Sequence, residues 1–211
     1  MAQLEHLSPS TAKQYHKCGR QVFFRKVQGL PDNTKYAVTQ YGSAMHEANE
    51  EFFNHKLEGK LLSLIDYKDL FIQKYGYLAD LTTIWKADTK EHLLGEGLKA
   101  AEEFYNMWGT NLRPQEVEHE YHIERPNGGW PIKCFTDLTT VNGTVLDYKY
   151  GRGFGGVQAG DFALAMSTYA EGYRQEHGNI PKVGILKHNW KRSKGLYYFA
   201  GFDLEFLPID E

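Results

Sequence analysis

Residues 137–149 read Asp137-Leu138-Thr139-Thr140-Val141-Asn142-Gly143-Thr144-Val145-Leu146-Asp147-Tyr148-Lys149. This segment predicts two β-strands joined by a turn at Val141-Asn142-Gly143. Side chains alternate along a strand, so Asp147 and Lys149 share one face of the second strand. The segment therefore predicts a hairpin with an acid and a base side by side on one face.

The length of the turn decides where Asp137 points. A two-residue Asn142-Gly143 turn would pair Asp137 with Tyr148 and put the two aspartates on opposite faces. A three-residue loop pairs Asp137 with Asp147, and loops of this class end with a residue in the left-handed region, usually glycine. Because Gly143 stands at that position, the turn favours the register that brings both carboxylates together.

Two adjacent carboxylates indicate a cation site. Like charges 4 Å apart repel by roughly 1 kcal/mol in water, and by more when they are desolvated. Mg²⁺ takes oxygen ligands and typically binds one or two protein carboxylates. Lys149 adds a positive charge that can orient or deprotonate a water molecule, or stabilise charge on a phosphoryl group. The alternative is a surface hairpin with cross-strand charges, because Asp-x-Lys alone is a common pattern.

The pattern of apolar residues divides the chain into a mainly helical part, residues 1–113, and a sheet part, residues 114–211. Ser8 and Pro9 predict a helix start, and the strand at 117–124 is expected to alternate, with Val117, His119, Tyr121 and Ile123 on one face. We expect one domain of α+β (mixed α/β) class, a mixed sheet flanked by helices. The predicted helices are 8–18, 42–55, 67–77, 86–108 and 161–177. The predicted strands are 117–124, 131–140, 144–150, 183–190 and 195–206, and 151–160 is a predicted glycine-rich loop.

The motifs occur in an order that resembles the RecB-like branch of the PD-(D/E)XK nuclease superfamily, including the nucleases of CRISPR adaptation. Asp137 and Leu146-Asp147-Tyr148-Lys149 resemble its catalytic core, and Gly42-Ser43-Ala44-Met45-His46 resembles its histidine helix. Three further pieces fall in the family order: the N-terminal segment from Leu7 to Phe24, the acidic strand at Glu118–Tyr121, and Tyr169 on the helix after the core. The resemblance spans about Leu7 to Tyr173.

The resemblance implies a restriction-endonuclease-like fold and a metal-dependent DNA nuclease that is an exonuclease. It implies that His46, Asp137, Asp147 and the backbone carbonyl of Tyr148 bind Mg²⁺ or Mn²⁺, and that Lys149 positions the attacking water. His46, Asp137, Asp147 and Lys149 are thus the expected catalytic residues. The implied setting is DNA processing, repair or recombination in a bacterial or phage-infected cell, with a helicase, recombinase or other protein as partner.

Departures from the family pattern limit what is carried over. Ala165 stands where the family has a glutamine before Tyr169, which weakens the role of Tyr169, and Gly19 replaces a proline after Cys18. Relatives with an iron–sulfur cluster have three C-terminal cysteines, whereas no cysteine follows Cys134, so we expect no cluster. A second hypothesis is therefore a catalytically idle module that binds nucleic acid or serves as a scaffold in a larger complex.

Several residues have both a functional interpretation and a purely structural one. Glu118 and Glu120 share a strand face and are expected to support the metal ligands, although a solvated face explains them equally well. Tyr169 is expected to support the site or face DNA, although it fits a core position too. Arg20, in a short basic stretch, and Arg152, in the glycine-rich loop, are candidates for contacts with DNA phosphates.

Composition limits the class of protein and the compartment in which it is expected. The chain has 211 residues, 41% hydrophobic residues and a net charge of −3, typical of a folded protein rather than a basic protein that coats DNA. We find no apolar run near the roughly 18 residues that span a bilayer and no secretory signal at Met1–Glu5. With two cysteines, a reducing compartment is expected and a disulfide framework is not, so we expect a cytoplasmic protein. His46-Glu47 lacks the second histidine of a zinc protease.

Overall fold

The computed structural model describes residues 6–31, 33–125, 128–152 and 159–208, with the backbone alone for 159–161. The predicted glycine-rich loop therefore lies largely outside the described residues. The elements are α1 (Pro9–Lys17), α2 (Gly19–Val22), the π-helical segment η1 (Phe23–Val27), α3 (Ala37–Leu57), α4 (Leu64–Asp80), α5 (Lys90–Phe104), the π-helical segment η2 (Tyr105–Gly109), β1 (Pro114–Ile123), β2 (Ile132–Thr140), β3 (Thr144–Lys149), α6 (Ala159–His177), β4 (Lys182–Ser193) and β5 (Leu196–Leu207).

The five strands form one mixed sheet in the order β1-β2-β3-β4-β5. All neighbours are antiparallel except β3 and β4, which are parallel because α6 crosses between them. A parallel pair needs such a crossover, whereas an antiparallel pair can be joined by a hairpin. The predicted α+β class, with a mixed sheet flanked by helices, is confirmed.

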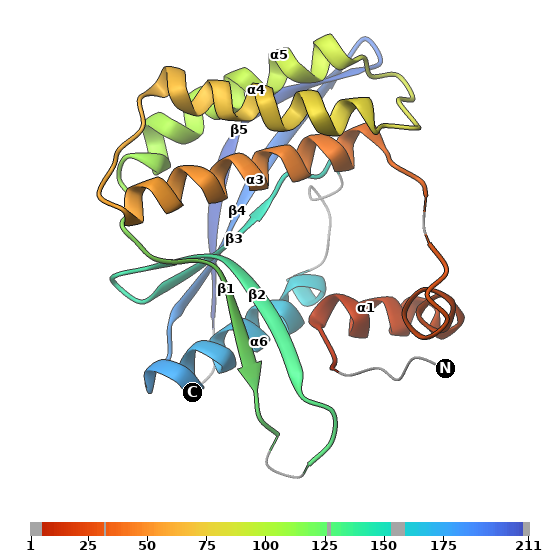
Figure 1. The fold of residues 1–211 in the computed structure, drawn as a ribbon, viewed down its shortest axis with the longest axis vertical. Helices are drawn as coiled ribbons and strands as arrows, with labels where there is room; N and C mark the ends of the chain where they lie inside the picture. Colours follow the sequence, from red (N-terminus) through yellow and green to blue (C-terminus); the bar gives the residue numbers. More distant parts are fainter. Residues whose placement is uncertain (1–5, 32, 126–127, 153–158, 209–211) are drawn as a thin grey trace.

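Helices cover both faces of the sheet. In Figure 1, α3, α4 and α5 lie together on one side, and α6 and α1 lie on the other. Two clusters of buried side chains correspond to these layers. The larger lies between the sheet and the helices α3, α4 and α5, and contains Phe52, Phe104 and Tyr148. The smaller lies under α6 and contains Val145, Met166 and Ile185.

Local sequence explains where several helices begin. The Ser8 side chain accepts a hydrogen bond from the Thr11 N–H at 3.2 Å, and Pro9 occupies the first turn of α1, as the sequence predicts. A serine cap satisfies an N–H that has no partner within the helix. Ser63 and Asp66 form a reciprocal capping box at α4. The helix predicted at 42–55 begins earlier, at Ala37.

Among the described residues, no helix is both long enough and apolar enough to cross a membrane.

The hairpin has the predicted three-residue loop. Leu138 pairs with Leu146 and Thr139 with Val145, which puts Asp137 opposite Asp147. Gly143 has φ +73° and its N–H donates to the Thr140 carbonyl at 2.9 Å. A side chain would be strained at this left-handed backbone position.

The predicted alternation along β1 is wrong at one residue. Val117 packs against the α3-side cluster, whereas Tyr121 lies in the α6-side cluster, although both were expected on one face. Between them, Glu118 has φ +47°, a left-handed conformation rare outside glycine. This residue reverses the alternation, so the hairpin of β1 and β2 passes from one layer of the protein to the other.

Candidate active site

The site forms where β2 separates from β3. β2 pairs with β1 from Ile132 to Thr140, whereas its pairing with β3 covers Leu138 and Thr139. Beyond that point the two strands diverge. Asp137 and Asp147 are the first residues past the last pair of the ladder, so their carboxylates lie at the base of the gap.

Three donor side chains converge beside this gap. Ligand atoms of His46, Glu118 and Asp137 all lie within 4.8 Å of one another. His46 comes from α3, and its Nδ1 lies 3.5 Å from Asp137 Oδ1. Glu118 lies across the β1–β2 ladder from Asp137, and its left-handed backbone marks the kind of strain that often accompanies functional positions.

Asp147 and Lys149 flank this group from β3. The Lys149 ammonium forms an ion pair with Asp147 Oδ2, and the Tyr169 hydroxyl of α6 donates to Asp147 Oδ1 at 3.3 Å. Asp147 is 3% exposed, so these are contacts of a buried carboxylate. The Tyr148 N–H donates to Asp137 Oδ2, which ties the two strands together at the site. The Tyr148 carbonyl as a metal ligand stays a prediction.

A buried amide holds the helix that carries His46. Asn49 is fully buried; its amide N–H donates to the Tyr150 hydroxyl, and its amide oxygen accepts from the Tyr67 hydroxyl. The His46 ring meets Tyr150 edge to face at 5.0 Å between centroids. Asn49 therefore links α3 to α4 and to the end of β3 one helical turn from His46.

Burial and mutual charge change the acidity of all four groups. Burial lowers the pKa of His46, but the charge and hydrogen bond of Asp137, together with the charge of Asp147, raise it by more, so the net shift is upward. Burial raises the pKa of Asp137, but His46, Lys149 and the Tyr148 N–H together hold it below its usual range. Burial and the Asp137 charge raise the pKa of Asp147 despite Lys149. Burial, then Asp137, raises the pKa of Glu118 to about 7. Negative charge thus accumulates here without enough positive charge to balance it.

The donor set suits a divalent cation. Two carboxylates and an imidazole, with a third buried carboxylate next to them, match the oxygen-rich sites of Mg²⁺ and Mn²⁺. His46, Glu118 and Asp137 can hold the ion, with Asp147 adjacent. The raised pKa of Glu118 supports this fit, because a cation in the group would stabilise the ionised carboxylate that burial disfavours.

Other predicted site residues lie elsewhere. Glu120 points away and pairs with Lys133 at 2.6 Å. Arg152 forms a two-bonded ion pair with Asp88 at 2.5 and 2.7 Å and stacks on Trp190 and Tyr197, so its guanidinium is held within the fold. Its contact with DNA phosphates stays a prediction. Arg20 is exposed on α2, and no contact of it with the site is seen among the described residues.

From the sequence, Glu118 was expected to support the metal ligands, whereas the structure brings it among the three converging donors. The available signal was its place on the acidic strand one hairpin away from Asp137. A second group, Glu116, His119 and Glu176, lies between β1 and the end of α6. Its members pair with one another, with His119 Nε2 at 3.1 Å from Glu176 and 4.0 Å from Glu116.

Comparisons with known proteins bear on the family and the fold of the chain. The model of the PD-(D/E)XK nuclease superfamily matches residues 6–201. The chain is similar in fold to the crystal structure of "Putative exonuclease" from Eubacterium rectale, with a TM-score of 0.56 at 14% identity over 98% of this chain and 73% of that one. The structure of SSO0001 gives a TM-score of 0.34 at 18% identity over 86% of this chain and 70% of that one, too low to carry an argument. No curated protein matches the chain.

Proposed function

The chain belongs to the PD-(D/E)XK nuclease superfamily, and from this premise we propose that it is a Mg²⁺- or Mn²⁺-dependent deoxyribonuclease that degrades DNA from an end. The observation that carries the proposal is the convergence of His46, Glu118 and Asp137 within 4.8 Å, beside Asp147 and Lys149. Buried like charges cost stability, so a site that keeps them together is explained by a cation that the charges bind.

The proposed ligands are His46, Asp137 and Asp147, with the Tyr148 carbonyl as the resemblance implies and Glu118 added by the geometry. When bound, the cation would stabilise negative charge on the phosphoryl oxygens and lower the pKa of a water molecule. The chain's own residues would set the direction of attack. The Lys149 ammonium, held by Asp147, would orient the water toward phosphorus, and Tyr169 would fix Asp147 through its hydrogen bond.

The proposed reaction is hydrolysis of a phosphodiester. A water oxygen forms a bond to phosphorus and gives up a proton, while the bond from phosphorus to one ester oxygen breaks. That ester oxygen takes up a proton, so the products are a phosphomonoester and a hydroxyl. Lys149 would stabilise the charge that develops on the phosphoryl group, a role that a fixed cation in a partly desolvated site performs well.

The test is cleavage of end-labelled linear and closed-circular DNA in Mg²⁺, Mn²⁺ or chelator. We expect metal-dependent loss of the linear substrate and survival of the circle. Asp137→Asn removes one ligand charge at constant shape and should abolish cleavage. Asp69→Asn, an exposed carboxylate on α4, is the matched control and should cleave normally.

The outcomes separate the hypotheses. Cleavage of the closed circle would make the protein an endonuclease. Equal activity of Asp137→Asn and wild type would place the chemistry elsewhere. Binding of DNA without cleavage in either metal would favour the idle module.

A further inference from the structure

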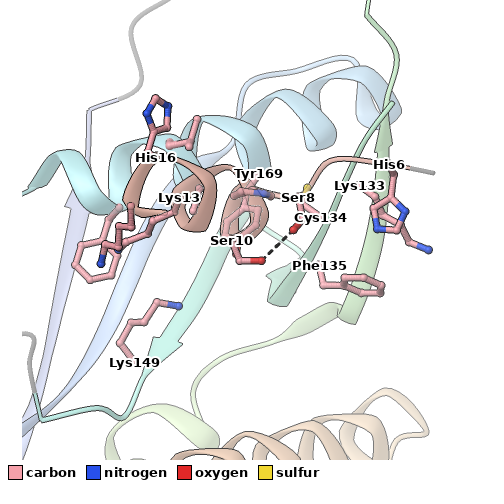
Figure 2. A pocket seen from close by; sticks show the side chains of 15 residues that line it. His6, Ser8, Ser10, Lys13, His16, Lys133, Cys134, Phe135, Lys149 and Tyr169 are labelled. Carbon is pink, nitrogen blue, oxygen red and sulfur yellow. Dashed lines mark hydrogen bonds between the residues drawn. The ribbon is translucent and has the colours of Figure 1, made fainter. Parts of the chain in front are cut away.

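A cavity of about 780 Å³ opens directly beside Lys149. Figure 2 shows it between α1, the strand β2 and the helix α6, with the Lys149 side chain pointing toward Ser10 and Tyr169. The separation of β2 from β3 leaves this space, and the N-terminal segment closes it on the outer side.

The closing segment is held in place by backbone hydrogen bonds. The Leu7 N–H donates to the Pro131 carbonyl at 2.9 Å, and the Lys133 N–H donates to the Leu7 carbonyl at 2.8 Å. Leu7 thus pairs alongside β2 at Ile132, on the edge that β3 leaves open. The capped start of α1 follows at once, and α1 also packs against α6.

The cavity wall is strongly basic. Its lining includes the ammonium groups of Lys13, Lys17, Lys133 and Lys149, and among the described residues that line it none is acidic. The whole chain carries a net charge of −3, so this concentration of lysines is local. Glu120 pairs with Lys133 from outside the lining. A basic surface next to an acidic metal-ligand group is what a phosphate chain leading to that group would need.

Aromatic rings interrupt the lysines. Phe135 is 48% exposed although it is large and apolar, and the Lys133 ammonium lies 5.6 Å from its ring centre. Phe162, with Lys13 over its ring at 5.8 Å, and Tyr169 also line the cavity. Proteins that bind single-stranded nucleic acid combine a basic groove with aromatic side chains on which unpaired bases stack.

We propose that this cavity binds unpaired nucleotides of a single-stranded nucleic acid and leads that strand to Lys149. This inference rests on the proposed function and names its substrate class. A duplex keeps its bases stacked on each other, so they cannot stack on Phe135, and a cavity of small-ligand size bounded by β2, α6 and α1 holds a few nucleotides rather than a double helix.

The test measures binding of the full chain in chelator, so that cleavage does not interfere. The probes are fluorescent oligo-dT and oligo-rU strands and a blunt hairpin duplex. We expect a single strand to bind at least 10-fold more tightly than the duplex, and the tighter of the two strands identifies the sugar. Phe135→Ala should weaken single-strand binding about 10-fold, since one base loses its stacking partner, and Phe135→Trp should restore it.

Salt dependence tests the lysines separately. Lys133→Met should lower the slope of log affinity against log salt by about 0.7 for one lost phosphate contact. Lys191→Met, an exposed lysine on β4 outside the cavity, should leave the slope unchanged. Duplex binding as tight as single-strand binding, or Phe135→Ala binding like wild type, would overturn the inference. If the cavity inference fails in this way but metal-dependent cleavage is observed, the proposed nuclease function still stands. If the chain binds single strands as expected but does not cleave them, the proposed nuclease function is wrong and the assignment of the cavity stands.

Discussion

Replacing Glu118 with glutamine should stabilise the metal-free protein, and the effect should grow with pH. The pKa of Glu118 is about 7 in the folded chain, against 4.5 for an ordinary glutamate. The folded state therefore binds the proton more tightly than the unfolded state, and stability is lost as pH rises from 4.5 through 7. The shift corresponds to up to about 3 kcal/mol at pH 8, where folded Glu118 is ionised, and to less than about 1 kcal/mol at pH 5.

The assay is denaturant unfolding of Glu118→Gln and wild type at pH 5 and pH 8, each with chelator and with Mg²⁺. In chelator the variant should be more stable at pH 8 by about 3 kcal/mol, which raises the melting temperature of a chain this size by about 6–12 °C. Added Mg²⁺ should stabilise wild type more than the variant, because the ion binds the folded state and the variant lacks one ligand charge.

The control is Glu205→Gln on β5, an exposed carboxylate that pairs with Lys187. It removes one exposed negative charge that already pairs with a lysine, and it should show no gain that grows with pH. If Glu118→Gln were no more stable than wild type at pH 8, or if its gain were the same at both pH values, the unbalanced negative charge inferred for the site would be refuted.

Three further predictions follow from other parts of the molecule. Lys149→Met should lower the cleavage rate by about 10²-fold or more while nucleic-acid binding changes far less; single-turnover rates and binding curves check this, and normal cleavage would remove Lys149 from the mechanism. Burial, then Arg152, lowers the pKa of His188 to about 3. The unfolded state therefore gains a proton first as pH falls below about 6.5, and the free energy of unfolding drops by about 2 kcal/mol by pH 5. His188→Phe should lose this pH dependence in unfolding titrations, and an unchanged dependence would contradict the prediction. A Cβ at Gly97 would overlap the Phe71 ring, so Gly97→Ala should lower the free energy of unfolding by about 1–3 kcal/mol. Gly76 has open space around it, so Gly76→Ala should leave the free energy of unfolding unchanged or raise it by up to about 1 kcal/mol. Equal melting temperatures of the two variants would refute the close packing at Gly97.

Sequence alone predicted the parts of the site that depend on local rules. The loop at Val141–Gly143 sets its own register through one left-handed glycine, and period-two alternation puts Asp147 and Lys149 on one face. Both follow from residues within a few positions of each other. The helix that carries His46 was predicted too, although its ends were misplaced because Tyr36 supplies no side-chain cap to mark the start.

The parts that sequence missed depend on distant neighbours. Nothing near Glu118 in sequence indicates a left-handed conformation, and the conformation persists where β1 pairs with β2 at Asp137 and the strand passes between two cores. The ion pair of Arg152 was likewise not foreseen, because its partner Asp88 lies 64 residues earlier, before α5. Composition cannot distinguish a charged side chain that pairs with a buried residue far along the chain from one that has no partner.

The buried amide of Asn49 also limits how far α3 can slide. Moving the helix by one residue shifts it 1.5 Å and turns it by about 100°. Such a slip would strand the amide and the hydroxyls of Tyr67 and Tyr150 in an apolar interior, at roughly 1–3 kcal/mol for each lost partner. Replacing all three groups together, by Asn49→Leu with Tyr67→Phe and Tyr150→Phe, would remove that penalty and let neighbouring alignments compete. Such a protein could melt at the same temperature and still hold its imidazole at the wrong height, so thermal screening would pass variants that metal affinity would reject.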